Sequence, residues 1–148
     1  MLYFRRMARI ARLQLLSSYE TIELAEQVLA ELMAGKGVGE ESTYWVSMAL
    51  REALANAIKH GNKLNPDTRV GVDLVCEDER LRIEVVDEGQ GFDVNALADP
   101  TAPENVLRQS GRGIFYMRHF MDEVNFSTTR QGGTRVELIK NLGLGRNL

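Results

Sequence analysis

The chain has 148 residues, of which 44% are hydrophobic and 26% are charged, and its formal net charge at pH 7 is -3. This length suits one domain with a sizeable core, and the negative charge argues against direct binding of nucleic acid or an anionic membrane. The single cysteine, Cys76, excludes an internal disulfide, and no apolar run approaches the roughly 18 residues of a membrane span, so we expect a cytoplasmic protein.

The N-terminal residues 1–8 carry arginines but lack the apolar run and cleavage site of a secretory signal. We treat them as an arm without an assigned function, because a frayed terminus is a simpler explanation than a surface for an acidic partner. Residues 8–17 partly alternate between apolar and polar, which predicts an edge strand. From Ser18 to Gly35, apolar residues recur at helical spacing and predict an amphipathic helix that covers a sheet.

A second helix is predicted from about Ser42, a candidate N-cap, through His60, with Gly61 as its stop. This alanine-rich segment places Glu52 and Asn56 one turn apart, and therefore on one face. A carboxylate and a carboxamide in that arrangement can serve a proton and a metal ion. Alone, the pair is better explained as the solvated polar edge of an amphipathic helix.

Two alternating runs, 69–76 and 80–87, follow a turn at residues 65–67 and predict an antiparallel hairpin. The second run ends in Asp87, with Gly89 and Gly91 immediately beyond it. Glycines after a strand end either shape a turn or let a ligand approach the backbone, and both interpretations stay open for this segment.

The connection from residue 93 to residue 110 is long and has little periodicity, and we interpret it as a lid. Gly111 and Gly113 then precede a helical pattern that extends to Met121, and amides at the start of a helix favour phosphate oxygens. The chain closes with a second hairpin, 123–130 and 134–139, whose turn contains Gly132 and Gly133. Residues 143–148 are a predicted tail.

None of these local patterns is specific by itself, but their order along the chain is. The chain places a helix with Glu and Asn first, then a strand ending in Asp-x-Gly-x-Gly, a lid, a Gly-x-Gly helix and a hairpin with Gly-Thr. This order resembles the GHKL ATPase superfamily of gyrases, heat-shock chaperones, histidine kinases and mismatch-repair proteins. Residues 51–62 are most similar to the stand-alone anti-sigma-factor serine kinases of bacteria. The resemblance covers roughly residues 9–142, which we predict to be a single ATP-binding domain.

The resemblance implies that ATP and Mg²⁺ are the cofactors. Glu52 would be the general base toward a serine hydroxyl, and Asn56 would give its amide oxygen to Mg²⁺. Asp87 would accept a hydrogen bond from the adenine amino group, while Thr134 would help through a bound water. The backbone would approach the base at two glycines, Gly89 and Gly91.

The triphosphate would be held by backbone amides of Gly111 and Gly113 as the lid folds over. Arg108 and Arg112 are candidate charge partners for the phosphates. Lys59 could also reach a phosphate, although a cation that complements the dipole at the end of its helix is an equally good account.

The implied architecture is an α+β two-layer sandwich, in which a mostly antiparallel mixed sheet carries helices on one face. The implied function is that of a homodimeric anti-sigma factor, which sequesters a sigma factor and phosphorylates a serine of a STAS-type anti-anti-sigma protein. The alternative is a nucleotide-dependent regulatory module of the same fold without phosphate transfer. A histidine kinase is disfavoured, because the only histidines, His60 and His119, both lie inside the predicted domain.

Overall fold

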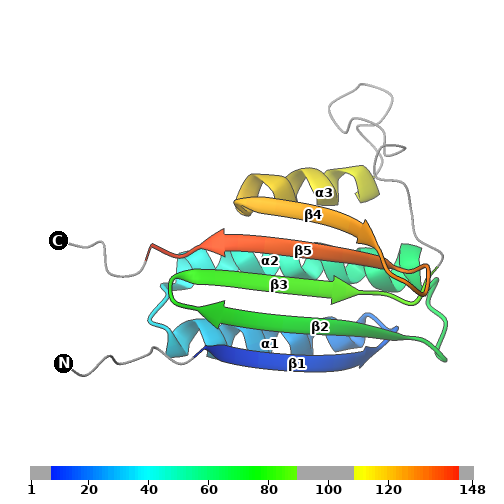
Figure 1. Cartoon of the computed structure of the whole chain (residues 1–148), viewed down its shortest axis with the longest axis horizontal. Coiled ribbons are helices and arrows are strands. Elements are labelled where there is room, and N and C mark those ends of the chain that lie inside the picture. Colours follow the sequence, from blue (N-terminus) through cyan, green and yellow to red (C-terminus); the bar gives the residue numbers. More distant parts are fainter. Residues whose placement is uncertain (1–7, 90–108, 144–148) are drawn as a thin grey trace.

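The computed structural model describes residues 8–89 and 109–143, and for 109–112 it describes the helical backbone alone. Figure 1 shows a sheet layer with helices behind it and beside it. The elements run from Arg9 to Asn141, inside the span predicted to be one domain. Among the helices of the described ranges, none combines the length and the apolar character needed to cross a membrane.

The sheet has five strands in the order β1-β2-β3-β5-β4, and each neighbouring pair is antiparallel. β1 lies at the edge, as its mixed pattern predicts, and both predicted hairpins are present. The described residues contribute no parallel pair, and the two-layer α+β prediction is confirmed. The strands are β1 (Arg9–Leu16), β2 (Arg69–Glu77), β3 (Arg80–Val86), β4 (Glu123–Thr128) and β5 (Thr134–Asn141).

The three α-helices are α1 (Glu20–Gly35), α2 (Glu40–Asn56) and α3 (Gln109–Phe120). α2 begins at Glu40 with Gly39 as its N-cap, so the prediction that Ser42 caps this helix is wrong. Gly39 is extended and lets the helix begin two residues earlier, which places Glu40 and Glu41 in the first turn, where negative charge is favoured. The Thr43 hydroxyl donates to the Gly39 carbonyl at 2.9 Å.

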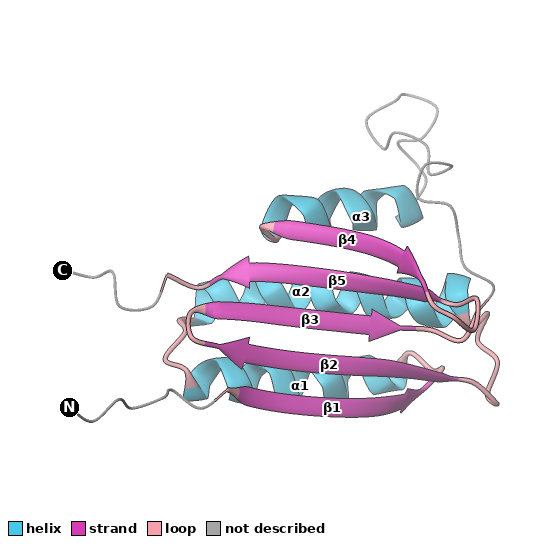
Figure 2. Ribbon diagram, viewed as in Figure 1, coloured by secondary structure: helices cyan, strands magenta, loops and turns pink. Residues whose placement is uncertain are grey.

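The apolar core lies between the sheet and the helices, which Figure 2 shows on one side of the strands. Strict alternation in the central strands sends every second side chain into this layer. The buried residues of β2 and β3 are Val70, Val72, Leu74, Cys76, Leu81, Ile83 and Val85. α2 contacts both α1 and α3, so it is the central helix of the second layer.

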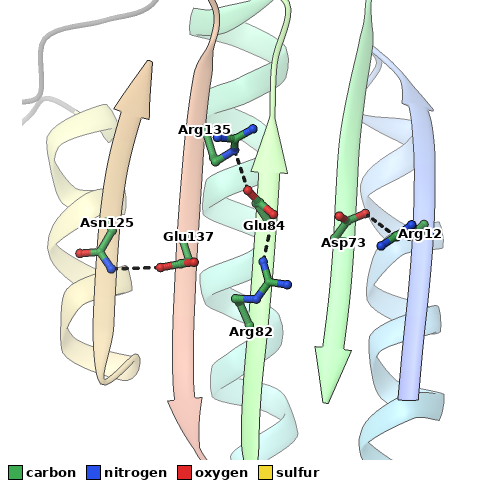
Figure 3. Close-up of polar contacts among 7 residues, drawn as sticks. All are labelled: Arg12, Asp73, Arg82, Glu84, Asn125, Arg135 and Glu137. Atoms are coloured by element: carbon green, nitrogen blue, oxygen red, sulfur yellow. Dashed lines mark hydrogen bonds and ion pairs between the residues drawn. The ribbon is translucent and has the colours of Figure 1, made fainter. Parts of the chain in front are cut away.

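The opposite face of the sheet carries polar and charged side chains, which Figure 3 shows crossing the strands. Glu84 lies between Arg82 and Arg135, at 3.0 Å and 2.6 Å from their nitrogens. Arg12 and Asp73 approach to 3.8 Å on the neighbouring pair of strands. Such half-exposed pairs contribute little individually. They do identify this face as the solvent face, so a buried site has to lie on the helix side or at an end of the sheet.

Candidate functional site

The candidate site lies at the end of the sheet where β3 ends, β5 begins and the helix α2 also ends (Figure 1). Asp87 is the first residue after β3 and is only 5% exposed. Its Oδ1 accepts hydrogen bonds from the backbone amides of Gly89 and Thr134, both at 3.0 Å. Its own amide donates to the Thr134 carbonyl at 3.0 Å. The chain therefore holds this carboxylate in one place.

Burial raises the pKa of Asp87 above its ordinary value, and the amides of Thr134 and Gly89 act in the opposite direction. Oδ1 is occupied by these two amides, whereas no described residue donates a hydrogen bond to Oδ2. Among the described residues Oδ2 therefore has no donor, and a carboxylate oxygen of this kind can accept a hydrogen bond from a ligand.

Three glycines surround Asp87 because side chains would not fit there. A Cβ on Gly61 would overlap with the Asp87 carboxylate, and a Cβ on Gly133 would overlap with the Asp87 carbonyl oxygen. A Cβ on Gly89 would overlap with the carbonyl of Gly61, which is backbone and cannot swing aside. The resemblance implies that Gly89 lets the backbone approach a ligand, and the structure shows this glycine packed against the backbone of Gly61.

Glu52 and Asn56 lie on α2, one turn apart, and both are half-buried. Burial raises the pKa of Glu52, and the neighbouring Arg51 partly counteracts this. Helix α3 crosses close to Glu52, so a Cβ on Gly113 would overlap with its carboxylate. Arg51 points elsewhere, because its guanidinium pairs with both carboxylate oxygens of Glu26 on α1, at 2.6 Å and 3.0 Å.

α3 is described from Gln109, so Gly111 and Gly113 lie inside this helix and not before it. The amide of Gly113 is four residues from Gln109 and therefore has a partner within the helix. Gly111 is left as the candidate amide donor to a phosphate, whereas Gly113 provides room for Glu52. Arg112 belongs to the same turn, and its side chain is outside the description.

The end of the Glu52 helix differs from the prediction. α2 ends at Asn56, and residues Ala57–Gly61 form one π-helical turn in place of a continued α-helix to His60. Lys59 and His60 are exposed on this turn, but the imidazole is still partly shielded from water. This desolvation, together with the charge of the nearby Lys59, lowers the pKa of His60. Single π-turns inside helices are frequent at functional sites.

Asn62 follows the π-turn and is a site residue that sequence reasoning missed. The residue is 4% exposed, and its side chain makes three hydrogen bonds, one of them from the Glu88 amide at 2.7 Å. An Asn after a helix-ending Gly is normally a turn residue, so the sequence contained no signal that it would be buried.

Two predicted site residues, Gly91 and Arg108, and the predicted lid up to residue 108 lie outside the described residues. The described part of the chain contains no group of three His, Cys, Asp or Glu side chains that could hold a metal ion. Asn56, the metal ligand that the resemblance implies, is the last residue of α2.

A family model described as a histidine kinase-like ATPase domain matches residues 15–140. The chain is 40% identical over 98 residues to an anti-sigma F factor of Heyndrickxia coagulans, which is 63% of this chain and 65% of that protein. It is 29% identical over 137 residues to the serine-protein kinase RsbW of Staphylococcus epidermidis, which is 86% of this chain and 84% of that protein. The aligned part of the anti-sigma F factor is just under two thirds of its length.

A solved structure of the RsbU and RsbW domains of Rv1364c from Mycobacterium tuberculosis superposes with a TM-score of 0.65. It covers 90% of this chain and 32% of that chain, at 18% sequence identity. A blue-light activated histidine kinase of Erythrobacter litoralis superposes with a TM-score of 0.56 at 19% identity, over 75% of this chain and 34% of that chain. At these identities the two structures support the fold alone.

Proposed function

The chain belongs to the family of histidine kinase-like ATPase domains, and we propose on this basis that it is an ATP-dependent anti-sigma-factor serine kinase. The observation that carries the proposal is that one continuous helical segment bears Glu52 and Asn56 and ends, at Gly61, against the buried Asp87. Asp87 is fixed by backbone amides, and Glu52 lies on the helix whose end contacts it through Gly61.

Asp87 is the proposed adenine acceptor. Its Oδ2 faces no described donor, so the adenine amino group can supply the missing hydrogen bond. Guanine and hypoxanthine carry an oxygen at that position and would place it against a carboxylate. Gly89 and Gly91 keep side chains away from the base, and Thr134 contributes through a bound water.

Asn56 is the proposed protein ligand of Mg²⁺. A carboxamide oxygen suits this hard cation, which usually takes few protein ligands and completes its octahedron with triphosphate oxygens and water. The half-buried position of Asn56 at the end of α2 fits such a site. When bound, Mg²⁺ neutralises charge that develops on the transferring phosphoryl group.

Glu52 is the proposed general base. Burial raises the pKa of its carboxyl, which makes the ionised form a better proton acceptor near neutral pH. It would take the proton of a serine hydroxyl as the serine oxygen bonds to the γ-phosphorus and the bond to the ADP oxygen breaks. Gly113 leaves this carboxylate the room to approach the acceptor.

The remaining phosphate contacts follow from charge and helix geometry. The amide of Gly111 and the cations Arg108, Arg112 and Lys59 are proposed to hold the triphosphate. The acceptor would be a STAS-type anti-anti-sigma protein, the sequestered partner a sigma factor, and the active form a homodimer. Partners of this kind act in the cytoplasm, which is the proposed location of the protein.

The proposal is tested by incubating the purified protein with Mg-ATP and each STAS-type protein encoded beside it, scoring phosphoserine and complex formation. Glu52→Gln should abolish transfer and leave ADP binding intact. Glu41→Gln, an exposed glutamate of the same helix, is the matched control and should transfer normally. Nucleotide-dependent complex formation without a phosphorylated acceptor would instead identify the regulatory module without transfer.

A further inference from the structure

We propose that Asn62 is a positioning residue for adenine recognition, because it fixes the peptide that follows Asp87 against the end of the Glu52 helix. The inference rests on the proposed function of Asp87 as the adenine acceptor. Asn62 is thereby expected to affect nucleotide selectivity, whereas a buried polar residue with a purely structural role would affect stability alone.

The orientation of the Asn62 side chain is determined by its partners. Its Oδ1 accepts from the Glu88 amide at 2.7 Å, while its Nδ2 donates to the Arg69 carbonyl and to the Ser17 hydroxyl, both at 2.9 Å. In the reversed orientation the side-chain NH₂ would face the Glu88 amide, which is also a donor, and the side-chain oxygen would face the Arg69 carbonyl, which is also an acceptor. Both hydrogen bonds to the backbone would then be lost. At 4% exposure, water cannot replace these partners without rearrangement.

The contact with Glu88 is the one that reaches the site. Asp87 is held on one side by Thr134 of β5, through hydrogen bonds in both directions. On its other side, the peptide that leads from Asp87 into Glu88 is held by Asn62. Oδ2 of Asp87 therefore has a fixed direction because both sides of the residue are anchored.

The same residue connects the two halves of the site. The π-turn ends with the Asn62 amide donating to the Ala57 carbonyl at 2.8 Å. Gly61, the preceding residue, packs against both the Asp87 carboxylate and Gly89. Asn62 thus joins the end of the helix that carries Glu52 and Asn56 to the loop that carries Asp87.

Selectivity for adenine is the measurement that separates positioning from general stability. The probes are ADP and inosine diphosphate, whose base has an oxygen in place of the amino group, titrated calorimetrically into the full chain. A hydrogen bond to a carboxylate predicts that the wild type prefers ADP by about 10- to 100-fold. Asn62→Ala should lower this ratio by at least about threefold, mainly by weakening ADP binding.

Ser17→Ala provides the matched control, because Ser17 is 5% exposed and belongs to the same network on the side away from Asp87. It removes one partner of Asn62 and leaves the Glu88 contact in place. We expect a lower melting temperature and the wild-type ratio. If Asn62→Ala melts below the assay temperature, Asn62→Ser leaves a hydroxyl and room for a water, and the same loss of selectivity is expected.

The outcomes are distinct. A wild type that binds ADP and inosine diphosphate equally would overturn the adenine role of Asp87, and with it the basis of this inference. A selective wild type whose Asn62 variants keep the full ratio would refute the positioning role alone. An equal loss of ratio in Ser17→Ala would show that selectivity follows the looseness of the whole network, which also contradicts the role of the Glu88 contact.

Discussion

Replacing Gly113 with alanine should separate the stability of the protein from its activity. The new Cβ would lie 3.3 Å from Cδ of Glu52 and would overlap with its Oε2. This carboxylate ends a flexible side chain, so it can move aside without a shift of the helix backbone. Alanine is favoured over glycine inside a helix by about 0.5–1 kcal/mol. The free energy of unfolding should therefore stay constant or rise by up to about 1 kcal/mol.

Activity should respond in the opposite direction. To reach ordinary van der Waals contact with the new Cβ, the Glu52 carboxylate has to move by about 1 Å. A displacement of that size can lower a reaction rate by up to about 100-fold. A general base contributes about 10²- to 10⁴-fold, so part of its effect would remain. We expect phosphate transfer to a STAS-type acceptor to slow by about 10- to 100-fold in single-turnover experiments. ADP affinity, measured by calorimetry, should change by less than about twofold.

Gly35→Ala is the control for the change in helix propensity. Gly35 ends α1 at the other end of the molecule (Figure 1), where a Cβ would overlap with the flexible guanidinium of Arg9. This variant should transfer phosphate at the wild-type rate. Normal transfer by Gly113→Ala would refute the assignment of Glu52 as the base. An unfolding free energy lowered by more than about 2 kcal/mol would show that the contact between α3 and Glu52 is rigid.

Three further experiments test the separate roles in the site. Burial raises the pKa of Glu52 in the folded state above its unfolded value of about 4.3. The stability that depends on the protonated Glu52 carboxyl is therefore complete below the unfolded pKa and is lost as pH rises through the folded-state pKa. Glu52→Gln should therefore raise the melting temperature of the unliganded protein by about 2 °C at pH 7.5 and by nothing near pH 4.5; a decrease at pH 7.5 would contradict the burial effect. Asn56→Ala should weaken ADP binding by about tenfold in Mg²⁺ and leave it unchanged in EDTA, and equal weakening in both would exclude a metal ligand. Because an adenine donor favours ionised Asp87, whose pKa is raised in the free protein, calorimetric ADP affinity should increase from pH 5 to pH 7, and Asp87→Asn should abolish this trend.

The sequence predicted the strands and helices well, because each depends on periodicity within its own segment. Alternation in residues 69–76 and 80–87 predicted the β2–β3 hairpin, and helical spacing predicted α1 and α3. The start of α2 was misplaced because an extended Gly39 can begin a helix without a side-chain cap. The π-turn at its end was missed because Ala57–Gly61 continues the apolar pattern of an ordinary helix.

The positions of Glu52, Asn56 and Asp87 could be predicted, since each stands at a helix face or a strand end that periodicity defines. The residues that hold them in place could not. Gly61 and Gly133 are needed because two segments distant in sequence approach Asp87, and no local pattern encodes that approach. Gly113 was predicted for a phosphate contact, although the structure places it against Glu52. Whether a glycine makes room for a ligand or for another part of the chain depends on the segment that packs against it.

The two carboxylates of the site are held in opposite ways, and the difference fits their proposed tasks. Oδ1 of Asp87 accepts two backbone amides, and glycines close around the residue. Glu52, in contrast, accepts no hydrogen bond from the described residues and faces Gly113. An acceptor that distinguishes adenine from other bases has to be fixed before the nucleotide arrives, since any displacement weakens selectivity. A general base has to be able to take up a proton when the acceptor docks, so a carboxylate without a hydrogen-bond donor among the described residues suits Glu52.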